Sequence, residues 1–323
     1  MIDRMALVFA IHAGADWPDH DHVSWHGHQF PEYSSRYRSA YGVSFWCDAT
    51  ASQQRKVIQM NALSGRLIGF FALACAMTWF GNLGNWLLPS PYWPTPMNPL
   101  GPLMAAPVFI LLADGRAGLA AWWRRITTFR APLWVYVVAF FGPLGVILGA
   151  GWLASLAGAP TGPLPAYSVG DVALLAPIML LAGPLPEELA FRGYLQHEIQ
   201  KELSPILTAL LVGIGVVVWH IPLLVMGELQ WPWAICIVAV SVVYAWLMNN
   251  GQSPWPAVMV HFVVNFFGGQ FFGLTITTPE GQMLYAEIYM GLYVLWAAGI
   301  ALLSGPSLGL SRSKGSVSVA AIA

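Results

Sequence analysis

Charged side chains are scarce in this sequence. They make up 9% of its 323 residues, whereas hydrophobic residues reach 57% and the mean hydropathy is +0.61. Soluble domains carry about 25% charged residues. Several apolar runs have the length of about 20 residues with which a helix crosses a hydrocarbon core roughly 30 Å thick. The composition therefore excludes an ordinary soluble domain and predicts an all-α fold, a polytopic membrane helix bundle.

Basic residues and cysteines are also few. The 14 Lys and Arg residues are balanced by 15 Asp and Glu residues, and no basic face with interleaved aromatics is present, so we expect no nucleic-acid partner. Cys47, Cys75 and Cys236 lie far apart without CxxC spacing. This spacing argues against a disulfide framework and against a thiolate zinc site.

Hydropathy predicts about eight transmembrane helices, in the membrane domain that we assign to residues 63–305. The segment RAGLAAWWRRITTFR, between the second and third of them, combines Trp with Arg and predicts a short amphipathic helix in the membrane interface. The predicted spans are residues 66–88, 98–113, 132–157, 170–186, 205–226, 232–249, 254–274 and 284–304.

The distribution of Lys and Arg predicts how these spans are oriented. Neither residue occurs in loops 89–97, 158–169, 227–231 and 275–283. All fourteen Lys and Arg residues lie in the segments on the opposite side of the predicted membrane spans, with Arg192 and Lys201 after the fourth span. Cytoplasmic loops are enriched in Lys and Arg. We therefore expect an integral multi-pass protein of the plasma (inner) membrane, with both termini, including a tail of residues 306–323, in the cytoplasm.

Residues 1–62 are polar and irregular, and we predict a disordered N-terminal segment. Five of the eight histidines fall within it, and such tracts bind metals adventitiously. An alternative is that translation starts at Met60, because the sequence that follows leads directly into the first predicted span.

Ionisable residues at membrane depth cost roughly 2.5 to 3.5 kcal/mol each and usually face a bundle interior or a cavity. Three apolar stretches of the C-terminal half carry such residues: PLPEELAFRGYL, VVVWHIP and VMVHFVVNFF. Each stretch alone fits a structural role, such as a snorkelling ion pair, a packed histidine or an interhelical amide. The occurrence of all three in order favours a functional site.

Glu188 and Arg192 are four residues apart with the acid first, the favoured order for a helical ion pair. Glu187 points about 100° away from its neighbour on a helix of 3.6 residues per turn, so it is free to face a cavity as a general base. Pro184 and Pro186 predict a break in the fourth span just before it.

His261 and Asn265 are also four residues apart, so their side chains lie on one helix face. A His and an Asn so placed could donate hydrogen bonds to an oxyanion. Pro222 weakens the helix next to His220 and could let this imidazole face Glu187.

The series EExxxR, aromatic-His and HxxxN, found here as EELAFRG, WHIPLL and PAVMVHFVVN, resembles the CAAX protease and bacteriocin-processing (CPBP, or Abi) family of membrane proteins over residues 170–270. That family also has eight spans. The resemblance implies an intramembrane endopeptidase. In this reading Glu187 and His220 activate a water, His261 and Asn265 stabilise the oxyanion, and Glu188 and Arg192 support them. Val216 departs from the family pattern, which often has Phe there, and affects pocket packing.

The resemblance implies catalysis without a cofactor by a glutamate-dependent site. A divalent metal such as zinc stays open as an alternative, with Glu187, His220 and His261 as ligands, although the HExxH spacing of common zinc peptidases is missing. The implied partners are the lipid bilayer and a peptide or protein substrate, membrane-embedded or prenylated.

Two other functional classes are alternatives to an endopeptidase. A non-catalytic membrane scaffold or immunity protein could keep the fold and use the polar cluster for binding. A secondary transporter is disfavoured because the spans show no internal repeat.

Overall fold

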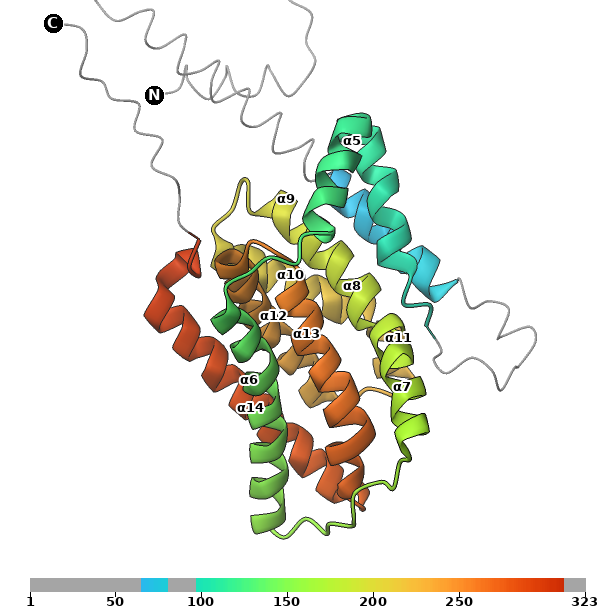
Figure 1. The fold of residues 1–323 in the computed structure, drawn as a ribbon, viewed down its shortest axis with the longest axis vertical. Helices are drawn as coiled ribbons and strands as arrows, with labels where there is room; N and C mark the ends of the chain where they lie inside the picture. The colour runs from blue at the N-terminus through green and yellow to red at the C-terminus, as the bar shows by residue number, and fades with distance from the viewer. Residues whose placement is uncertain (1–64, 81–96, 311–323) are drawn as a thin grey trace, which may run out of the picture. The chain divides into compact units, whose positions relative to one another are not determined.

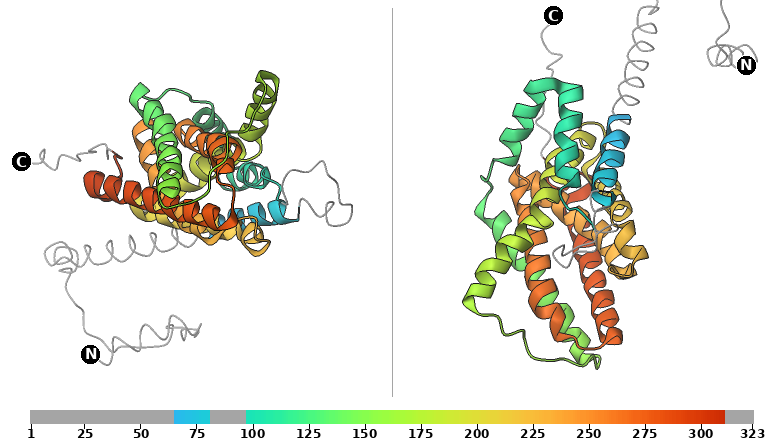
Figure 2. Two further views of the ribbon diagram at one scale, coloured as in Figure 1. Left: turned by 90° about the horizontal axis from the view of Figure 1, so that it is seen from below. Right: turned by 90° about the vertical axis from the view of Figure 1, so that its right-hand side faces the viewer.

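The computed structural model describes residues 65–80 and 97–310, which lie in the second of two compact units, residues 59–323. The predictions for residues 1–62, including the histidine tract and the Met60 start, and those for residues 311–323 fall outside this range. The described residues are mostly helical, and their one isolated β-bridge pairs Thr161 with Ile276. The all-α prediction is therefore confirmed for this part of the chain (Figures 1 and 2).

Six helical stretches in the described residues are long and apolar enough to cross a membrane. Two shorter apolar helices, Gly65–Trp79 and α10 (Pro205–Trp219), occupy the positions of the first and fifth predicted spans. Six spans of sufficient length are therefore present in the described residues, and the prediction of about eight is not confirmed. The six stretches are α5 (Gly101–Ile126), α6 (Leu133–Leu156), Val169–Ile199, α12 (Trp231–Gly251), Trp255–Thr275 and Pro279–Ser307, which contains α14 (Pro279–Ser304).

Helix α5 has two arms that meet at Gly115 (Figure 1). Gly115 has φ 61° and ψ −156°, a backbone conformation that side chains with a Cβ rarely adopt. The first arm corresponds to the predicted span 98–113. The second arm, residues 116–126, contains most of the segment predicted to form a separate amphipathic helix and ends with Arg124 and Arg125 in its last turn.

Two of the long stretches are interrupted where the polar motifs lie. Val169–Ile199 consists of α7 (Val169–Leu181), α8 (Pro184–Ala190), the π-helix η1 (Phe191–Gln196) and α9 (His197–Ile199). Trp255–Thr275 consists of α13 (Trp255–Val263), the π-helix η2 (Val264–Phe272) and the short η3 (Gly273–Thr275). π-Helical segments are rare and are often found at functional sites.

The predicted break before Glu187 is present, because α7 ends at Leu181 and α8 begins at Pro184, with Gly183 as its N-cap. The predicted weakness at Pro222 is also confirmed. Helix α10 ends at Trp219, His220 lies in the junction, and α11 (Ile221–Val225) starts immediately before this proline. Both breaks place polar residues at helix ends, where backbone groups are free to bond side chains.

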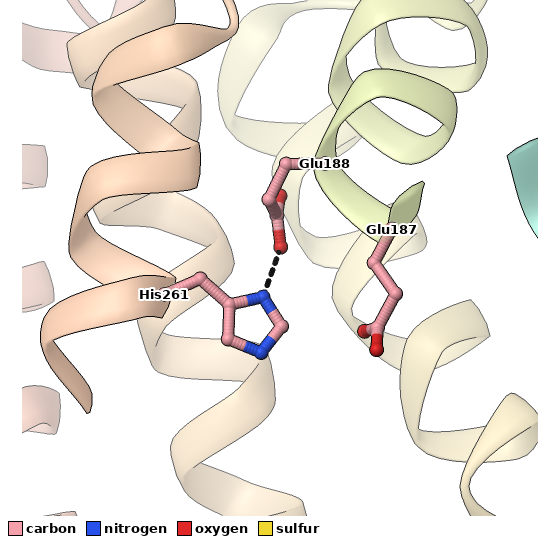
Figure 3. Close-up of side chains that lie close together, drawn as sticks. All are labelled: Glu187, Glu188 and His261. Atoms are coloured by element: carbon pink, nitrogen blue, oxygen red, sulfur yellow. Dashed lines mark hydrogen bonds and ion pairs between the residues drawn. The ribbon is translucent and has the colours of Figure 1, made fainter. Parts of the chain in front are cut away.

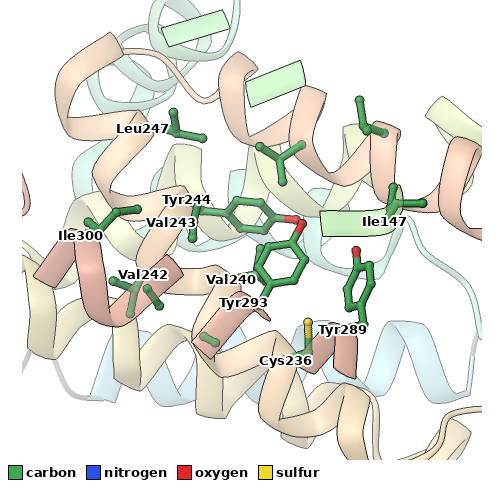
Figure 4. Packing of buried hydrophobic residues seen from close by; sticks show 14 of the residues in the cluster. Ile147, Cys236, Val240, Val242, Val243, Tyr244, Leu247, Tyr289, Tyr293 and Ile300 are labelled. Carbon is green, nitrogen blue, oxygen red and sulfur yellow. The ribbon is translucent and has the colours of Figure 1, made fainter. Parts of the chain in front are cut away.

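Helix α12 is the most buried of the long helices and packs against α10 and α14. One hydrophobic cluster joins α12 to α6, α13 and α14, and its tyrosines Tyr244, Tyr289 and Tyr293 lie among aliphatic side chains (Figure 4). A second cluster joins the helix Gly65–Trp79, α5, α8 and α10. The polar motifs on α8 and α13 lie where these two clusters meet.

Two loops that the charge distribution assigned to one side of the membrane are paired with each other. The Gly162 amide donates to the Thr275 carbonyl at 2.7 Å, and the Thr277 amide donates to the Pro160 carbonyl at 3.1 Å. Loops 158–169 and 275–283 therefore lie at the same end of the bundle.

Candidate active site

The two glutamates of α8 are both buried, with 6% exposure for Glu187 and 2% for Glu188. Figure 3 shows that their side chains diverge: Glu188 points toward His261 on α13, and Glu187 lies beside the same imidazole without bonding it. This divergence follows from adjacent positions on a helix. The two carboxylates can therefore serve different purposes.

The Glu188 carboxylate has two partners. Its Oε1 is 2.8 Å from Nδ1 of His261, and its Oε2 is 3.1 Å from Nε of Arg192. The second contact is an ion pair by distance, but neither atom makes an aligned hydrogen bond. Sequence reasoning predicted the pair with Arg192, and the bond to His261 was not foreseen.

Arg192 is 1% exposed and belongs to η1 in the bundle interior. The expectation that it lies in a cytoplasmic loop was wrong, because its charge is compensated inside the protein. One terminal nitrogen donates to Ser241 Oγ at 2.9 Å, and the guanidinium carbon lies 4.5 Å from the centroid of the Tyr244 ring. A buried charge is tolerated only when it is paired and hydrogen-bonded in this way.

Gly183 marks the point where three polar side chains converge. A Cβ atom at this position would lie 3.2 Å from Glu187 Oε1, 3.4 Å from Asn265 Nδ2 and 3.9 Å from His261 Nε2. Sequence reasoning missed this glycine, although its place directly before PLPEE was the available signal. Because Gly183 has no side chain, the space between these three polar atoms stays open.

The imidazole of His220 is hydrogen-bonded to the last turn of α10, the helix that ends just before it. Its Nδ1 lies 2.8 Å from the Val216 carbonyl oxygen, which can only accept, so Nδ1 carries a proton and donates it. Trp219 packs edge-on against the ring at 4.6 Å and donates from Nε1 to Thr78 Oγ1. Trp79 donates to the Trp219 carbonyl at 2.9 Å. The helix Gly65–Trp79 therefore braces this junction and leaves Nε2 of His220 available.

These groups line a common cavity of about 150 Å³. The side chain of Val216 is also part of its wall, so the departure from the family pattern lies directly beside His220. All six residues that the motifs singled out line this cavity: Glu187, Glu188, Arg192, His220, His261 and Asn265.

Residues 169–267 match the family model described as type II CAAX prenyl endopeptidase Rce1-like. The predicted family resemblance is confirmed over this segment, which contains all six residues. No curated protein matched the chain. With its long apolar helices, this is an integral multi-pass membrane protein in which residues 169–267 are similar to a protease family.

Within residues 169–267, one group of described residues could hold a metal ion. Ligand atoms of Glu187, Glu188 and His261 lie within 4.8 Å of one another. His220 is not part of this group, so the ligand set suggested by the sequence is not the one that the fold brings together. Both oxygens of Glu188 already face His261 and Arg192, and a metal would have to compete with these partners.

Proposed function

We propose that this protein is an intramembrane endopeptidase that hydrolyses a peptide bond with a water molecule activated by Glu187 and His220. One observation carries the proposal: Glu187 Oε1, His261 Nε2 and Asn265 Nδ2 converge at the helix break beside Gly183, on a cavity that His220 also lines. The match of this segment to a protease family model supports the same conclusion.

The bonds of the two activating residues suit the binding of one water. Because Nδ1 of His220 donates to the Val216 carbonyl, Nε2 of a neutral ring is an acceptor. The Glu187 carboxylate is a second acceptor. A water that donates one proton to each would direct its oxygen lone pair away from both, toward a substrate carbonyl carbon.

Asn265 and His261 supply the donors for the oxyanion. The Asn265 amide donates from Nδ2, as preorganised side-chain amides do in other hydrolases. His261 already donates from Nδ1 to Glu188, so it donates from Nε2 as well only in the doubly protonated form. The Glu188 carboxylate provides the counter-charge for that imidazolium, which makes Glu188 a positioning residue.

Hydrolysis of the peptide bond then proceeds in two steps. The water oxygen bonds to the carbonyl carbon, its proton passes to Glu187, and the carbonyl oxygen becomes an oxyanion facing Asn265 and His261. The bond between carbon and nitrogen breaks, and Glu187 returns its proton to the leaving amine. The products are a carboxylic acid and an amine, and no redox partner is needed.

We extend the proposal to the surrounding protein. Residues 63–305 form the catalytic membrane domain, the helix Gly65–Trp79 and α10 belong to the first and fifth of eight crossings, and both termini lie in the cytoplasm. The site works without a metal.

A cleavage assay tests this function. Purified protein in detergent is incubated with a mixed peptide library that includes prenylated peptides, and wild type is compared with Glu187→Ala and His220→Ala, each with and without a chelator. We expect cleavage by wild type that is lost in both variants and survives chelation. Equal behaviour of all three proteins would favour a binding or scaffold role instead.

A further inference from the structure

A second and larger cavity adjoins the active-site cavity. It has a volume of about 920 Å³, and the two cavities share part of their wall, including Asn265 and Tyr289. We call the larger cavity the vestibule. Its wall also contains Glu228 and Gln282, which are both exposed polar residues, so the vestibule reaches the surface of the bundle. Water can therefore approach the active-site cavity through the vestibule.

Three tyrosines of α14 lie along the boundary between these cavities. Tyr285 lines the vestibule, Tyr289 lines both cavities, and Tyr293 lines the active-site cavity. Their spacing of four residues places them on one face of the helix. The ring centroids are 5.8 Å apart for the first pair and 5.0 Å apart for the second pair, which Figure 4 shows. We call these three residues the tyrosine ladder, and it leads from the vestibule to the proposed reacting atoms.

The hydroxyls of the tyrosine ladder are buried and underused. Tyr285 is 5% exposed, Tyr289 1% and Tyr293 0%, and none of their hydroxyls makes an aligned hydrogen bond within the described residues. The hydroxyls of Tyr289 and Tyr293 are close enough to interact with each other. One bond between them would use only one of their two protons and would do nothing for Tyr285. Because a buried hydroxyl without a partner is unfavourable, this arrangement requires a small polar partner.

Water fits the space and the bonding pattern along the ladder. Each tyrosine hydroxyl donates one proton and accepts, and so complements water. A buried water needs about 10 to 15 Å³ and about two to four polar partners. The active-site cavity has a volume of about 150 Å³, and Glu187, His220 and Asn265 are further polar partners on its wall. Several waters can therefore bridge the ladder and the catalytic groups.

We propose that the tyrosine ladder binds a file of ordered waters that joins the vestibule to the active-site cavity. These waters position and replace the one that Glu187 and His220 activate. Tyr285, Tyr289 and Tyr293 are then positioning residues, because they act through water and not on the peptide. The kinetic part of this inference rests on the proposed function, whereas the hydration part does not.

X-ray footprinting of the intact wild-type protein in detergent, without peptide, tests the hydration. Radiolysis of a bound water produces hydroxyl radicals that oxidise the adjacent side chains, and tandem mass spectrometry locates the products. Phe70 is the control, because it is an aromatic residue with 0% exposure that lines neither cavity. We expect Tyr289 and Tyr293 to be oxidised roughly tenfold faster than Phe70, since ordered water contacts their hydroxyls.

Tyr289→Phe tests the kinetic part, because it removes the middle hydroxyl and keeps the ring. We expect kcat to fall about two- to tenfold with KM unchanged, the effect of losing one hydrogen bond to the water. Oxidation of Tyr293 should fall in this variant, while oxidation of Tyr285 should persist. Tyr136→Phe is the control, because the Tyr136 hydroxyl donates to the Phe129 carbonyl and lines neither cavity.

Oxidation of the ladder no faster than that of Phe70 would overturn the inference. A Tyr289→Phe protein with a higher melting temperature and wild-type kcat would also overturn it, because removal of a dry, unpartnered hydroxyl stabilises a protein. Equal losses of kcat in Tyr289→Phe and Tyr136→Phe would do the same. A raised KM with unchanged kcat would assign the ladder to peptide binding and end its role in holding water. If wild type cleaves no peptide, the proposed function fails, and footprinting still decides the hydration part.

Discussion

Glu188 and His261 are joined by a hydrogen bond of 2.8 Å between Oε1 and Nδ1. This bond connects α8 to α13 across the interior of the bundle and sets which imidazole nitrogen faces the cavity. The other oxygen of the same carboxylate lies 3.1 Å from Arg192. One buried carboxylate therefore ties the ring orientation of His261 to a buried cation.

Replacing Arg192 by Met should destabilise the protein by about 3 to 5 kcal/mol, because the buried Glu188 carboxylate loses its arginine partner. Lys201→Gln is the control, since Lys201 is 49% exposed and its pair with Glu198 contributes at most about 1 kcal/mol. Chemical unfolding of both variants in the same detergent provides the comparison. Equal stability of the two would contradict the buried-pair interpretation.

Glu187→Gln keeps the shape of the side chain and removes the general base. We expect kcat to fall by about 10²- to 10⁴-fold, the usual contribution of a positioned acid or base, with peptide affinity retained. Stopped assays on purified variant and wild type, together with equal melting temperatures, would separate lost chemistry from lost folding. A variant with wild-type kcat would remove Glu187 from the mechanism.

Asn265→Ala should lower kcat/KM by roughly 10²- to 10³-fold, as expected when one oxyanion donor is lost. Asn250→Ala is a matched control, because the Asn250 amide donates locally to the Trp246 carbonyl and lines neither cavity. Kinetics on one cleaved peptide would distinguish them. The assignment would be refuted by similar losses in both variants.

Gly183→Ala should lower kcat by roughly ten- to hundredfold, because its Cβ would lie 3.2 Å from Glu187 Oε1 and force a displacement in the site. Gly145→Ala is the control, since Gly145 lies in α6 with open space at its Cα. We expect that exposed helical site to gain about 0.5 to 1 kcal/mol without loss of activity. Kinetics and melting curves on both variants measure these effects, and unchanged kcat in Gly183→Ala would contradict the geometry.

Removal of divalent metals should leave the cleavage rate unchanged, because Glu188 is engaged with His261 and Arg192. The measurement is peptide cleavage after chelation and dialysis, followed by metal analysis of the active sample. Activity that disappears and returns with zinc would show that Glu187, Glu188 and His261 act as a metal site.

The sequence by itself determined several features of this protein. Long apolar runs with few charges required membrane helices, because backbone polar groups in lipid must be satisfied internally. The proline positions placed the breaks near Glu187 and His220, since proline cannot continue the hydrogen bonding of a helix. The six residues that the three polar stretches singled out all line the cavity, and the i to i+4 spacing identified the pair of Glu188 with Arg192.

Tertiary structure decided the rest. The bond from Glu188 to His261 spans 73 positions in sequence and depends on how α8 and α13 pack, which no local pattern encodes. The π-helices that hold Arg192 and Asn265, and the burial of Arg192 away from the loops, are consequences of interior packing. Gly183 likewise lies among three polar atoms only because separate helices pack together there, and their side chains meet at this point.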